Sequence, residues 1–345
     1  MTAEQVHLIA RRGAYPGAGS PARVVETHIS WVLLGDEYAF KIKKPVRLSF
    51  LDFSTPEQRA FYCREEVRLN RRLAPDMYLD VLSVQPTSSG GWAIGLTDPE
   101  RPVIDYAVWM KRMDNGRQMD VLLRQGAVGP ADMAALAALL APFHRAYALA
   151  AGTFAGPTAD DYFADFADLF TWATVAQRLL GDAAPRAFET WKPLVQRFIA
   201  DYYARLHTRE QRGFCVDGHG DLHARNIFLL PQGPVIFDCI EFSPHLRRLD
   251  VLNELAFLLM DVEAEGYPSL AKDFLKAYSE LWRCIEEQED EHLLTYFKAY
   301  RANIRLKIAL LQWEQERQEA AAQRARQYWG VLENYMAYLA LNVGR

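Results

Sequence analysis

The chain has 345 residues, which at about 150 residues per domain predicts roughly two folded units, large enough to bury a core without disulfides or structural metal. Half of the residues are hydrophobic and 24% are charged, which is typical of a globular protein and excludes a mostly disordered chain or a collagen. The net charge of −5 lacks the strong basic excess of a general nucleic-acid binder, so we expect no nucleic-acid partner.

The four cysteines are scattered and form no C-x-x-C pair, so the sequence offers neither a zinc knuckle nor a redox motif. We expect a reduced, cytoplasmic location. The N-terminus has no continuous apolar core of signal-peptide length, and the longest apolar stretch, 134–143, is too short to span a bilayer. We therefore expect neither export nor membrane insertion.

The first third of the chain reads as β-rich with one helix. A hydroxyl cap at Ser54, an early proline and Glu57 predict a helix that runs to about Leu73 and ends before Pro75. Alternating or β-branched runs bounded by turn residues predict the strands. These strands are expected at 23–34, 38–43, 80–84, 91–96 and 103–113.

The rest of the chain reads as mainly helical after a polar linker at 114–116. Helical patterning extends over 119–206, with breaks at 126–130, 152–157 and 181–185. Short strands and tight loops are expected over 214–244, and helices resume from about Leu246 to the end. The sequence thus divides into residues 1–113 and 114–345.

The most informative stretch is His-Gly-Asp-Leu-His-Ala-Arg-Asn at 219–226, followed by two apolar runs separated by a turn at 231–234. If the runs pair as an antiparallel hairpin, Asn226 comes to lie beside Asp238. An amide oxygen and a carboxylate are hard ligands of the kind that suits Mg²⁺ shared with substrate phosphates. Asp221, on the loop that leads into the hairpin, would stand nearby to accept a hydroxyl proton.

The spacing from Asp221 to Asn226 equals that of the D-x-x-x-x-N catalytic loop of protein kinases. HGDLHARN with the downstream VIFDCIEF resembles the aminoglycoside phosphotransferase and choline kinase branch of the kinase-like fold. ETHISW, KIKKPV, FLDFST and RLNRRLAP resemble an uncharacterised bacterial phosphotransferase group within that branch. The resemblance implies an α+β, bilobal protein-kinase-like fold. Its antiparallel-sheet lobe, 1–113, would bind the nucleotide, and its mainly helical lobe, 114–345, would carry the catalytic loop and the acceptor site.

The resemblance also implies residue roles: Asp221 as catalytic base, Asn226 and Asp238 as Mg²⁺ ligands, and a strand lysine paired with a helix glutamate. Lys41 and Lys43 lie on one face of the predicted strand and compete for the lysine's role; Lys41 is favoured because it follows an apolar run as the family's lysine does.

Helical periodicity favours Glu66 as the partner of the strand lysine, because Glu66 lies on the apolar face of the predicted helix. Glu65 instead lies on the same face as Arg68 and Arg72. Lys43 and Lys44 are expected to be solvated.

Roles are also predicted for several further residues. The segment Thr27-His28-Ile29-Ser30 has no glycine, and the resemblance implies that Thr27 and Ser30 take the place of the glycine-rich loop of protein kinases and bind the β-phosphate. His219 is expected to hold the loop rather than to react. Asp250 fits either a helix-start carboxylate or the family's loop-stabilising aspartate.

The function that follows is an ATP- and Mg²⁺-dependent phosphotransferase that moves the γ-phosphoryl group to a hydroxyl of a small molecule, aminoglycoside-like or amino-alcohol-like. The alternative is a kinase-like nucleotide-binding module that acts with a partner protein. The chain contains no G-x-x-x-x-G-K-[ST] match, so a P-loop ATPase partner would be a separate polypeptide. A third interpretation takes His219, Asp221 and His223 as an H-x-D-x-H metal cluster of a hydrolase.

Overall fold

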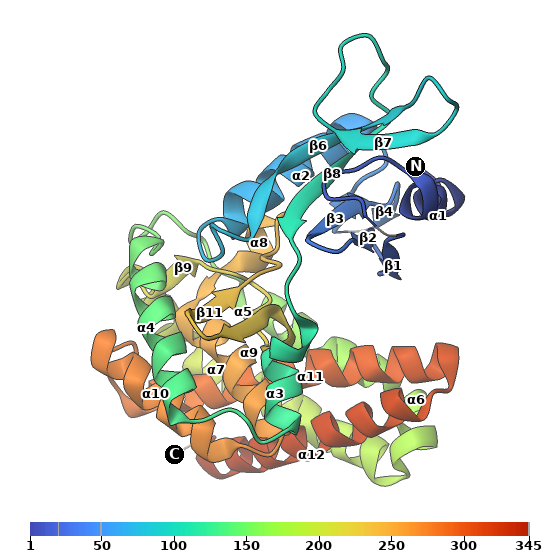
Figure 1. The fold of residues 1–345 in the computed structure, drawn as a ribbon. Helices are drawn as coiled ribbons and strands as arrows, with labels where there is room; N and C mark the ends of the chain where they lie inside the picture. The colour runs from blue at the N-terminus through green and yellow to red at the C-terminus, as the bar shows by residue number, and fades with distance from the viewer. Residues whose placement is uncertain (20, 49, 344–345) are drawn as a thin grey trace. The chain divides into compact units, whose positions relative to one another are not determined.

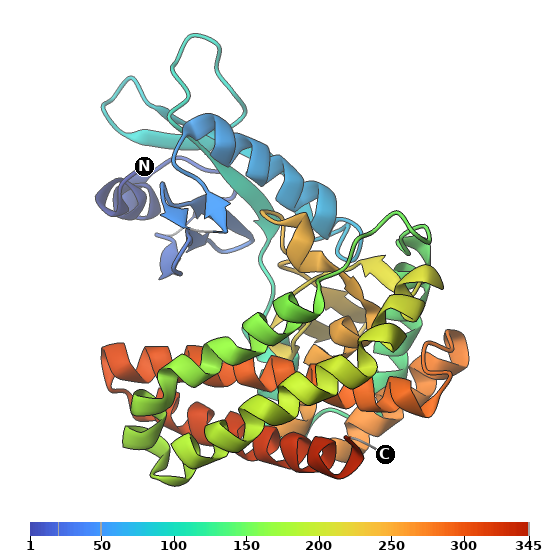
Figure 2. The same cartoon turned by 180° about the vertical axis from the view of Figure 1, so that it is seen from behind.

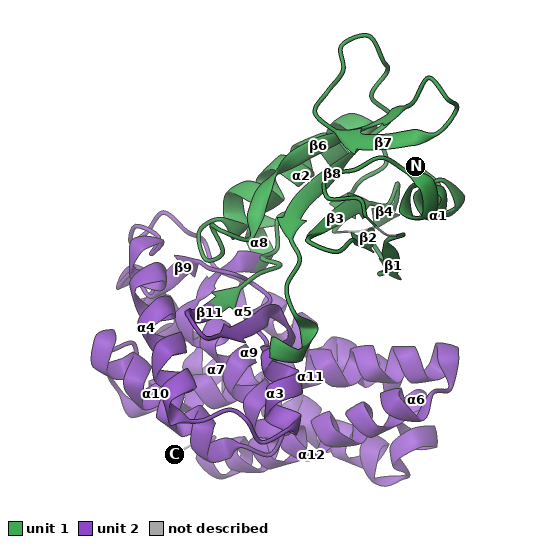
Figure 3. Ribbon diagram, viewed as in Figure 1, with its two compact units in different colours: residues 1–117, 235–246 green, residues 118–234, 247–345 purple. Residues whose placement is uncertain are grey.

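A computed structural model describes residues 1–19, 21–48 and 50–343 of the chain. These residues form two compact units (Figure 3). Unit 1 contains residues 1–117 and 235–246, and unit 2 contains residues 118–234 and 247–345. The chain therefore leaves unit 1, builds part of unit 2, and returns to unit 1 for one short segment. That returning segment carries Asp238.

Unit 1 is built on a six-stranded sheet with the order β1-β2-β3-β8-β6-β7, and every pair in it is antiparallel (Figure 1). Its strands are β1 (Arg23–Glu26), β2 (Ser30–Leu34), β3 (Tyr38–Lys43), β6 (Tyr78–Pro86), β7 (Trp92–Gly95) and β8 (Asp105–Lys111). A separate short pair is formed by β4 (Arg47–Leu48) and β5 (Leu51–Asp52). Lys41 lies opposite Val32 on β2 and Val108 on β8, so the lysine stands on a central strand.

In its described residues, the first third of the chain contains two α-helices, one more than the sequence predicts. The unexpected one, α1 (Ala3–Arg12), begins with a capping box in which Thr2 and Gln5 satisfy each other's backbone N–H groups. The predicted helix, α2 (Pro56–Asn70), is capped by Thr55 with Gln58, one residue later than expected, and ends at Asn70 instead of Leu73. Residues 71–73 are turns.

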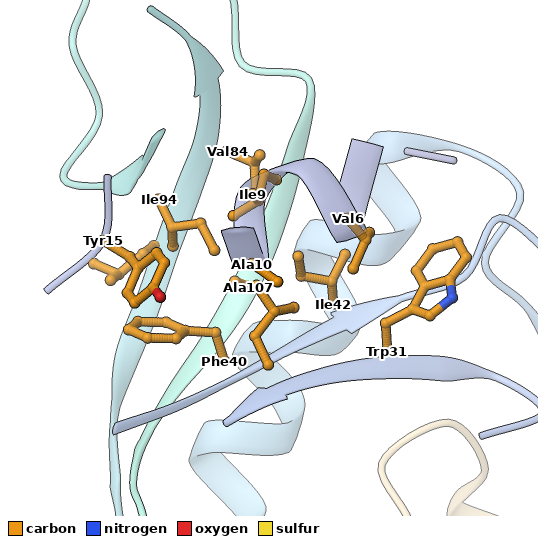
Figure 4. Packing of buried hydrophobic residues seen from close by; sticks show 12 residues of the cluster. Val6, Ile9, Ala10, Tyr15, Trp31, Phe40, Ile42, Val84, Ile94 and Ala107 are labelled. Carbon is orange, nitrogen blue, oxygen red and sulfur yellow. The ribbon is translucent and has the colours of Figure 1, made fainter. Parts of the chain in front are cut away.

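The core of unit 1 lies between α1 and one face of the sheet (Figure 4). Val6 and Ile9 of α1 are fully buried against Phe40 and Ile42 of β3. The amphipathic pattern of α1 thus covers the sheet with a second layer, which accounts for a helix at the start of the chain.

Unit 2 is mainly helical, as the sequence predicts. Its helices are α3 (Met119–Arg124), α4 (Pro130–Ala146), α5 (Ala159–Ala167), α6 (Ala173–Leu180), α7 (Ala183–Gln211), α9 (Val251–Ala264), α10 (Pro268–Leu281), α11 (Gln288–Glu316) and α12 (Glu319–Asn342). The long helices α11 and α12 lie side by side (Figures 1 and 2). Within the described residues, we find no helix with both the length and the apolar character needed to cross a bilayer.

Short elements between the helices shape the loop region of unit 2. They are η2 (Asp168–Trp172), β9 (Cys215–Asp217), η3 (Ala224–Asn226), β10 (Ile227–Leu230) and β12 (Arg248–Asp250). β9 and β12 pair antiparallel. β11 (Gly233–Ile236) forms a two-stranded sheet with β10, α8 (Pro244–Arg247) begins in the returning segment, and η1 (Asn115–Arg117) ends the first stretch of unit 1.

Asp250 marks the junction between β12 and α9. Its Oδ1 accepts the Leu252 N–H at 2.7 Å, which caps α9, and its carboxylate also binds the fully buried Arg209 guanidinium at 2.7 and 2.9 Å. The helix-start interpretation of Asp250 is therefore correct, and the buried arginine supplies the countercharge.

Candidate active site

Asp221 lies in a loop whose own side chains hold it in place. The Asn226 amide nitrogen donates to the Asp221 carbonyl oxygen at 3.0 Å and to its carboxylate Oδ2 at 3.1 Å. His223 Nε2 lies 3.4 Å from the same Oδ2, and its Nδ1 accepts the Arg225 N–H. In the neutral ring the proton is therefore on Nε2, facing Asp221. The structure thus brings Asp221 and Asn226 into direct contact within unit 2.

A buried carboxylate beneath the loop fixes its backbone. Glu254 of α9 accepts the N–H groups of His219 at 2.5 Å and Gly220 at 3.0 Å. Gly220 has φ +83°, a left-handed conformation that favours glycine, and a Cβ added at Gly218 would lie 2.7 Å from Glu254 Oε1. The His-Gly-Asp sequence is therefore shaped by backbone geometry and by one acid from another helix.

The electrostatic surroundings keep Asp221 ionised. Burial raises the pKa of the Asp221 carboxyl, but His223, His219 and Arg305 oppose it, and the net pKa lies below its usual range. His219 also accepts the Asp221 N–H through Nδ1, the loop-holding role expected for it. An ionised carboxylate with fixed orientation can accept a proton from a hydroxyl group.

In unit 1, Lys41, Glu66 and Asp238 form a chain of ion pairs. Lys41 Nζ lies 2.9 Å from Glu66 Oε1 and 2.6 Å from Asp238 Oδ1. Two buried side chains fix the segment around Asp238: Tyr78 Oη accepts the Asp238 N–H at 3.2 Å, and Asn70 Oδ1 accepts the Cys239 N–H at 2.9 Å. The three charged groups that the sequence selects from distant positions are thus in contact.

Lys43 is not solvated, contrary to expectation. Its side chain is fully buried, with Nζ 2.6 Å from Glu66 Oε2 and a second ion pair to Glu241. Lys41 and Lys43 point to the same face of β3 and share Glu66. Lys44, directly after β3, is also not solvated: its side chain is 14% exposed and pairs with the half-exposed Glu26 at 2.6 Å.

The two buried glutamates respond differently to the same lysines. Burial raises the pKa of Glu66, but Lys41 and Lys43 together lower it further, to about 2. Glu241 faces Lys43 and the negative charge of Glu66, so burial and that charge raise its pKa. Glu66 is therefore the group that keeps its charge most strongly, and the half-buried Glu65 is paired with Arg68 instead.

The shift of Glu66 predicts an acid-dependent loss of stability. Because its folded pKa is lowered from 4.5 to about 2, its contribution is fully present above pH 4.5 and is lost as the pH falls toward 2. In urea unfolding between pH 6 and pH 3, the Glu66→Gln variant should lose less stability with acid than the unmodified protein does. The matched control Glu65→Gln should follow the unmodified protein; an equal acid slope in both variants would contradict the assignment.

The turn between β1 and β2 contains Thr27 and Ser30. Thr27 Oγ1 accepts the Ser30 N–H at 3.0 Å and donates to the Ser30 carbonyl oxygen at 3.1 Å, so this hydroxyl closes the turn. Ser30 is fully buried, and within the described ranges its Oγ has no hydrogen-bond partner. The phosphate-binding role of these two residues stays a prediction.

Asn226, in unit 2, and Asp238, in unit 1, each carry a donor type predicted for the metal. Asn226 contributes an amide oxygen and Asp238 a carboxylate that is 42% exposed, both hard oxygen donors suited to Mg²⁺. Asp238 has φ +66°, a strained conformation for a residue other than glycine and one that recurs at functional sites. In the described part of the chain no group of three or more His, Cys, Asp or Glu side chains could hold a metal, so the H-x-D-x-H interpretation finds no cluster.

The sequence matches a known family over most of its length. A family described as "Phosphotransferase enzyme family" matches residues 50–287. The chain belongs to this family. The resemblance to aminoglycoside phosphotransferases and choline kinases is thereby confirmed at the level of the family.

Two relatives of this phosphotransferase family member are mycobacterial. Uncharacterised proteins of Mycobacterium tuberculosis (strain H37Rv) and Mycobacterium bovis are each 32% identical to it over 318 residues, or 91% of this chain. The chain spans 60% of the length of each relative.

Solved structures confirm the kinase-like α+β fold. A choline/ethanolamine kinase family protein from Mesorhizobium loti superposes with a TM-score of 0.54 at 14% identity, covering 98% of both chains. The GDP complex of aminoglycoside 2'-phosphotransferase-IIIa gives 0.52 at 12% identity, covering 97% of this chain and 98% of that one. A choline kinase from Cryptosporidium parvum gives 0.52 at 11% identity, covering 98% and 97%.

The sequence leaves Lys43 open as the alternative to Lys41 and does not predict the roles of two buried acids, Glu241 and Glu254. Glu254 leaves a visible signal, because it is a single acid within the apolar helix start 251–260. A carboxylate in such a run needs a buried partner, and here the partners are backbone N–H groups.

Proposed function

We propose that the protein is an ATP- and Mg²⁺-dependent phosphotransferase that transfers the γ-phosphoryl group to a hydroxyl of a small molecule. The observation that carries this proposal is the Asp221–Asn226 contact in a loop with kinase spacing. Family membership supports the reaction type, and the ion-paired lysine of unit 1 supplies a group for phosphate binding.

Asp221 acts as the base. Its carboxylate accepts the proton of the acceptor hydroxyl while that oxygen attacks the γ-phosphorus and the bond to the leaving diphosphate breaks. Asn226 orients the carboxylate through its amide nitrogen, and His223 stabilises the negative charge.

Lys41 binds the nucleotide phosphates in this proposal. Glu66 holds the ammonium group in a fixed position. Burial lowers the pKa of Lys41, but the charges of Asp238 and Glu66 more than offset it, so the pKa lies well above its usual value and Lys41 stays charged. A permanently charged, fixed lysine is suited to stabilise phosphate oxygens electrostatically.

Asn226 and Asp238 would hold Mg²⁺ through oxygen atoms. When bound, the ion would neutralise charge on the transferring phosphoryl group. The acceptor class follows the structural neighbours, whose names include choline/ethanolamine kinases and an aminoglycoside phosphotransferase, so amino-alcohols and aminoglycosides come first.

The direct test incubates the purified protein with MgATP and a panel of amino-alcohols and aminoglycosides, and detects phosphorylated product by mass spectrometry. GTP belongs in the panel, because a neighbour was solved with GDP. Product that requires both the acceptor and Mg²⁺ supports the proposal. Specific nucleotide binding with no transfer to any hydroxyl acceptor would favour a nucleotide-binding module instead.

The Asp238→Ala variant should raise the KM for MgATP by at least about tenfold and reduce turnover, because a proposed metal ligand is lost. Lys41 keeps its Glu66 partner in this variant, so the fold should be retained. The control Asp76→Ala removes an exposed carboxylate of the same unit and should leave the KM unchanged. The ATP dependence of the initial rate at fixed free Mg²⁺ measures both; equal KM values would exclude the metal role of Asp238.

A further inference from the structure

Unit 2 contains a pocket of about 530 Å³ that the proposed reaction does not use. Neither Asp221 nor Asn226 lines it. Its walls come from α3, η3, α9, α11 and α12, and most of its lining side chains are charged. The charged ones are Asp120, Arg124, Arg225, Asp261, Glu265, Arg305 and Arg324.

Two of the three acids of the pocket, Asp120 and Glu265, lie beside Arg124. Asp120 lies 2.9 Å from Arg124 and 3.4 Å from Arg225, and Glu265 lies 3.7 Å from Arg124. Two carboxylates therefore balance the positive charge of Arg124. Burial and the neighbouring acids Asp261 and Asp120 raise the pKa of Glu265, with Arg124 opposing them.

Two arginines of the pocket have neutral hydrogen-bond partners. Arg305 donates to the Tyr328 hydroxyl at 3.1 and 3.0 Å, and Arg324 donates to the Gln312 side-chain oxygen at 2.9 Å. In the part of the chain that is described, neither guanidinium forms an ion pair with a carboxylate. Burial and the charges of Arg225 and Arg305 lower the pKa of Arg324, whereas Asp261, together with the Tyr328 hydroxyl that donates to it, more than offsets burial and raises the pKa of Arg305.

One buried acceptor in the same pocket is also unsatisfied. Asp120 is 6% exposed, and among the described residues its Oδ1 has no hydrogen-bond partner. A buried carboxylate oxygen without a donor is costly, and a hydroxyl group of a ligand would satisfy it.

We propose that this pocket binds a phosphorylated hydroxy compound, with its phosphate between Arg225, Arg305 and Arg324 and a hydroxyl on Asp120. Guanidinium groups bind phosphate oxygens through paired, charge-assisted hydrogen bonds. The volume falls in the range of small-molecule pockets, about 300–1,000 Å³, and leaves room for more than a bare phosphate.

The site adjoins the candidate catalytic loop through its backbone. Arg225 precedes Asn226 directly, and the Ala224 N–H donates to Asp261, which accepts from the Tyr328 hydroxyl. A ligand on Arg225 would therefore contact the residue directly before Asn226, the proposed metal ligand.

The test is isothermal titration calorimetry at low ionic strength, without nucleotide or Mg²⁺. The probes are glucose 6-phosphate, glycerol 3-phosphate, inorganic phosphate and glucose. A phosphorylated compound should bind, and glucose should not. Arg324→Gln should weaken the binding at least tenfold, whereas Arg326→Gln, on the same helix but paired with Glu319 outside the pocket, should leave it unchanged.

Two further variants keep the test decisive. Ala320→Glu places a carboxylate at an exposed position of the pocket wall and should abolish binding with the fold intact. Lys41→Met should leave binding unchanged, because Lys41 belongs to the nucleotide site. The proposal is overturned if no phosphate compound binds at millimolar concentration, if Arg324→Gln and Arg326→Gln bind alike, or if Lys41→Met alone loses binding. Equal affinity for inorganic phosphate would overturn the hydroxyl contact on Asp120.

Discussion

The Asp221→Asn variant is expected to lose phosphoryl transfer, with kcat lower by about 10²- to 10⁴-fold, the range that general-base catalysis contributes. The amide is nearly isosteric with the carboxylate, so the contact with Asn226 changes little in size, but an amide cannot accept the hydroxyl proton. MgATP should still bind, because the lysine, Glu66 and Asp238 are untouched. Product formation and nucleotide titration on the same preparation measure the two effects separately.

The matched control is Asp201→Asn, an exposed aspartate of α7 that lies 3.9 Å from Arg197. Its kcat should equal that of the unmodified protein. The roles assigned here would be wrong if Asp221→Asn kept full turnover, or if it lost nucleotide binding and turnover together, since the second result would indicate a collapsed loop.

The second large effect separates Lys41 from Lys43. Lys41→Met should raise the KM for MgATP by at least about tenfold and reduce kcat, because the proposed phosphate contact is lost. Lys43→Met should instead destabilise the fold by about 3–5 kcal/mol, because it leaves Glu241 and one oxygen of Glu66 buried without their ammonium partner.

Urea unfolding and steady-state kinetics on both variants test this division of roles. Lys192→Met serves as the control, because Lys192 is an exposed lysine of α7 and its replacement should alter neither property strongly. A larger kinetic effect in Lys43→Met than in Lys41→Met, at a temperature where both variants are folded, would reverse the assignment of the two lysines.

The sequence alone predicts the parts of the site that are local in the chain. The D-x-x-x-x-N spacing places Asp221 and Asn226 in one loop, and helical periodicity turns Glu66 inward because its neighbours on that face are apolar. The sheet and helix classes follow from alternation and from 3.6-residue periodicity, and the helical stretches of unit 2 agree closely with the observed breaks. Both kinds of signal depend on residues only a few positions apart.

What the sequence does not predict depends on contacts between distant positions. Lys43 is buried beside Glu241, which is 198 positions away in the sequence. The residues around Lys43 in the sequence do not indicate that such a distant partner exists. The helix α1 shows a different limit: its Thr2–Gln5 capping box is visible, but the sheet face that it covers is formed only by tertiary structure.

The hydrogen bonds between Glu254 and the candidate catalytic loop have a consequence for the order of folding. Its two backbone contacts join residues 219 and 220 to an acid 35 and 34 positions later. We therefore expect the loop to take its final conformation only after α9 has docked. Catalytic competence should thus be among the last properties that a refolding chain regains, after the secondary structure of the sheet unit has formed.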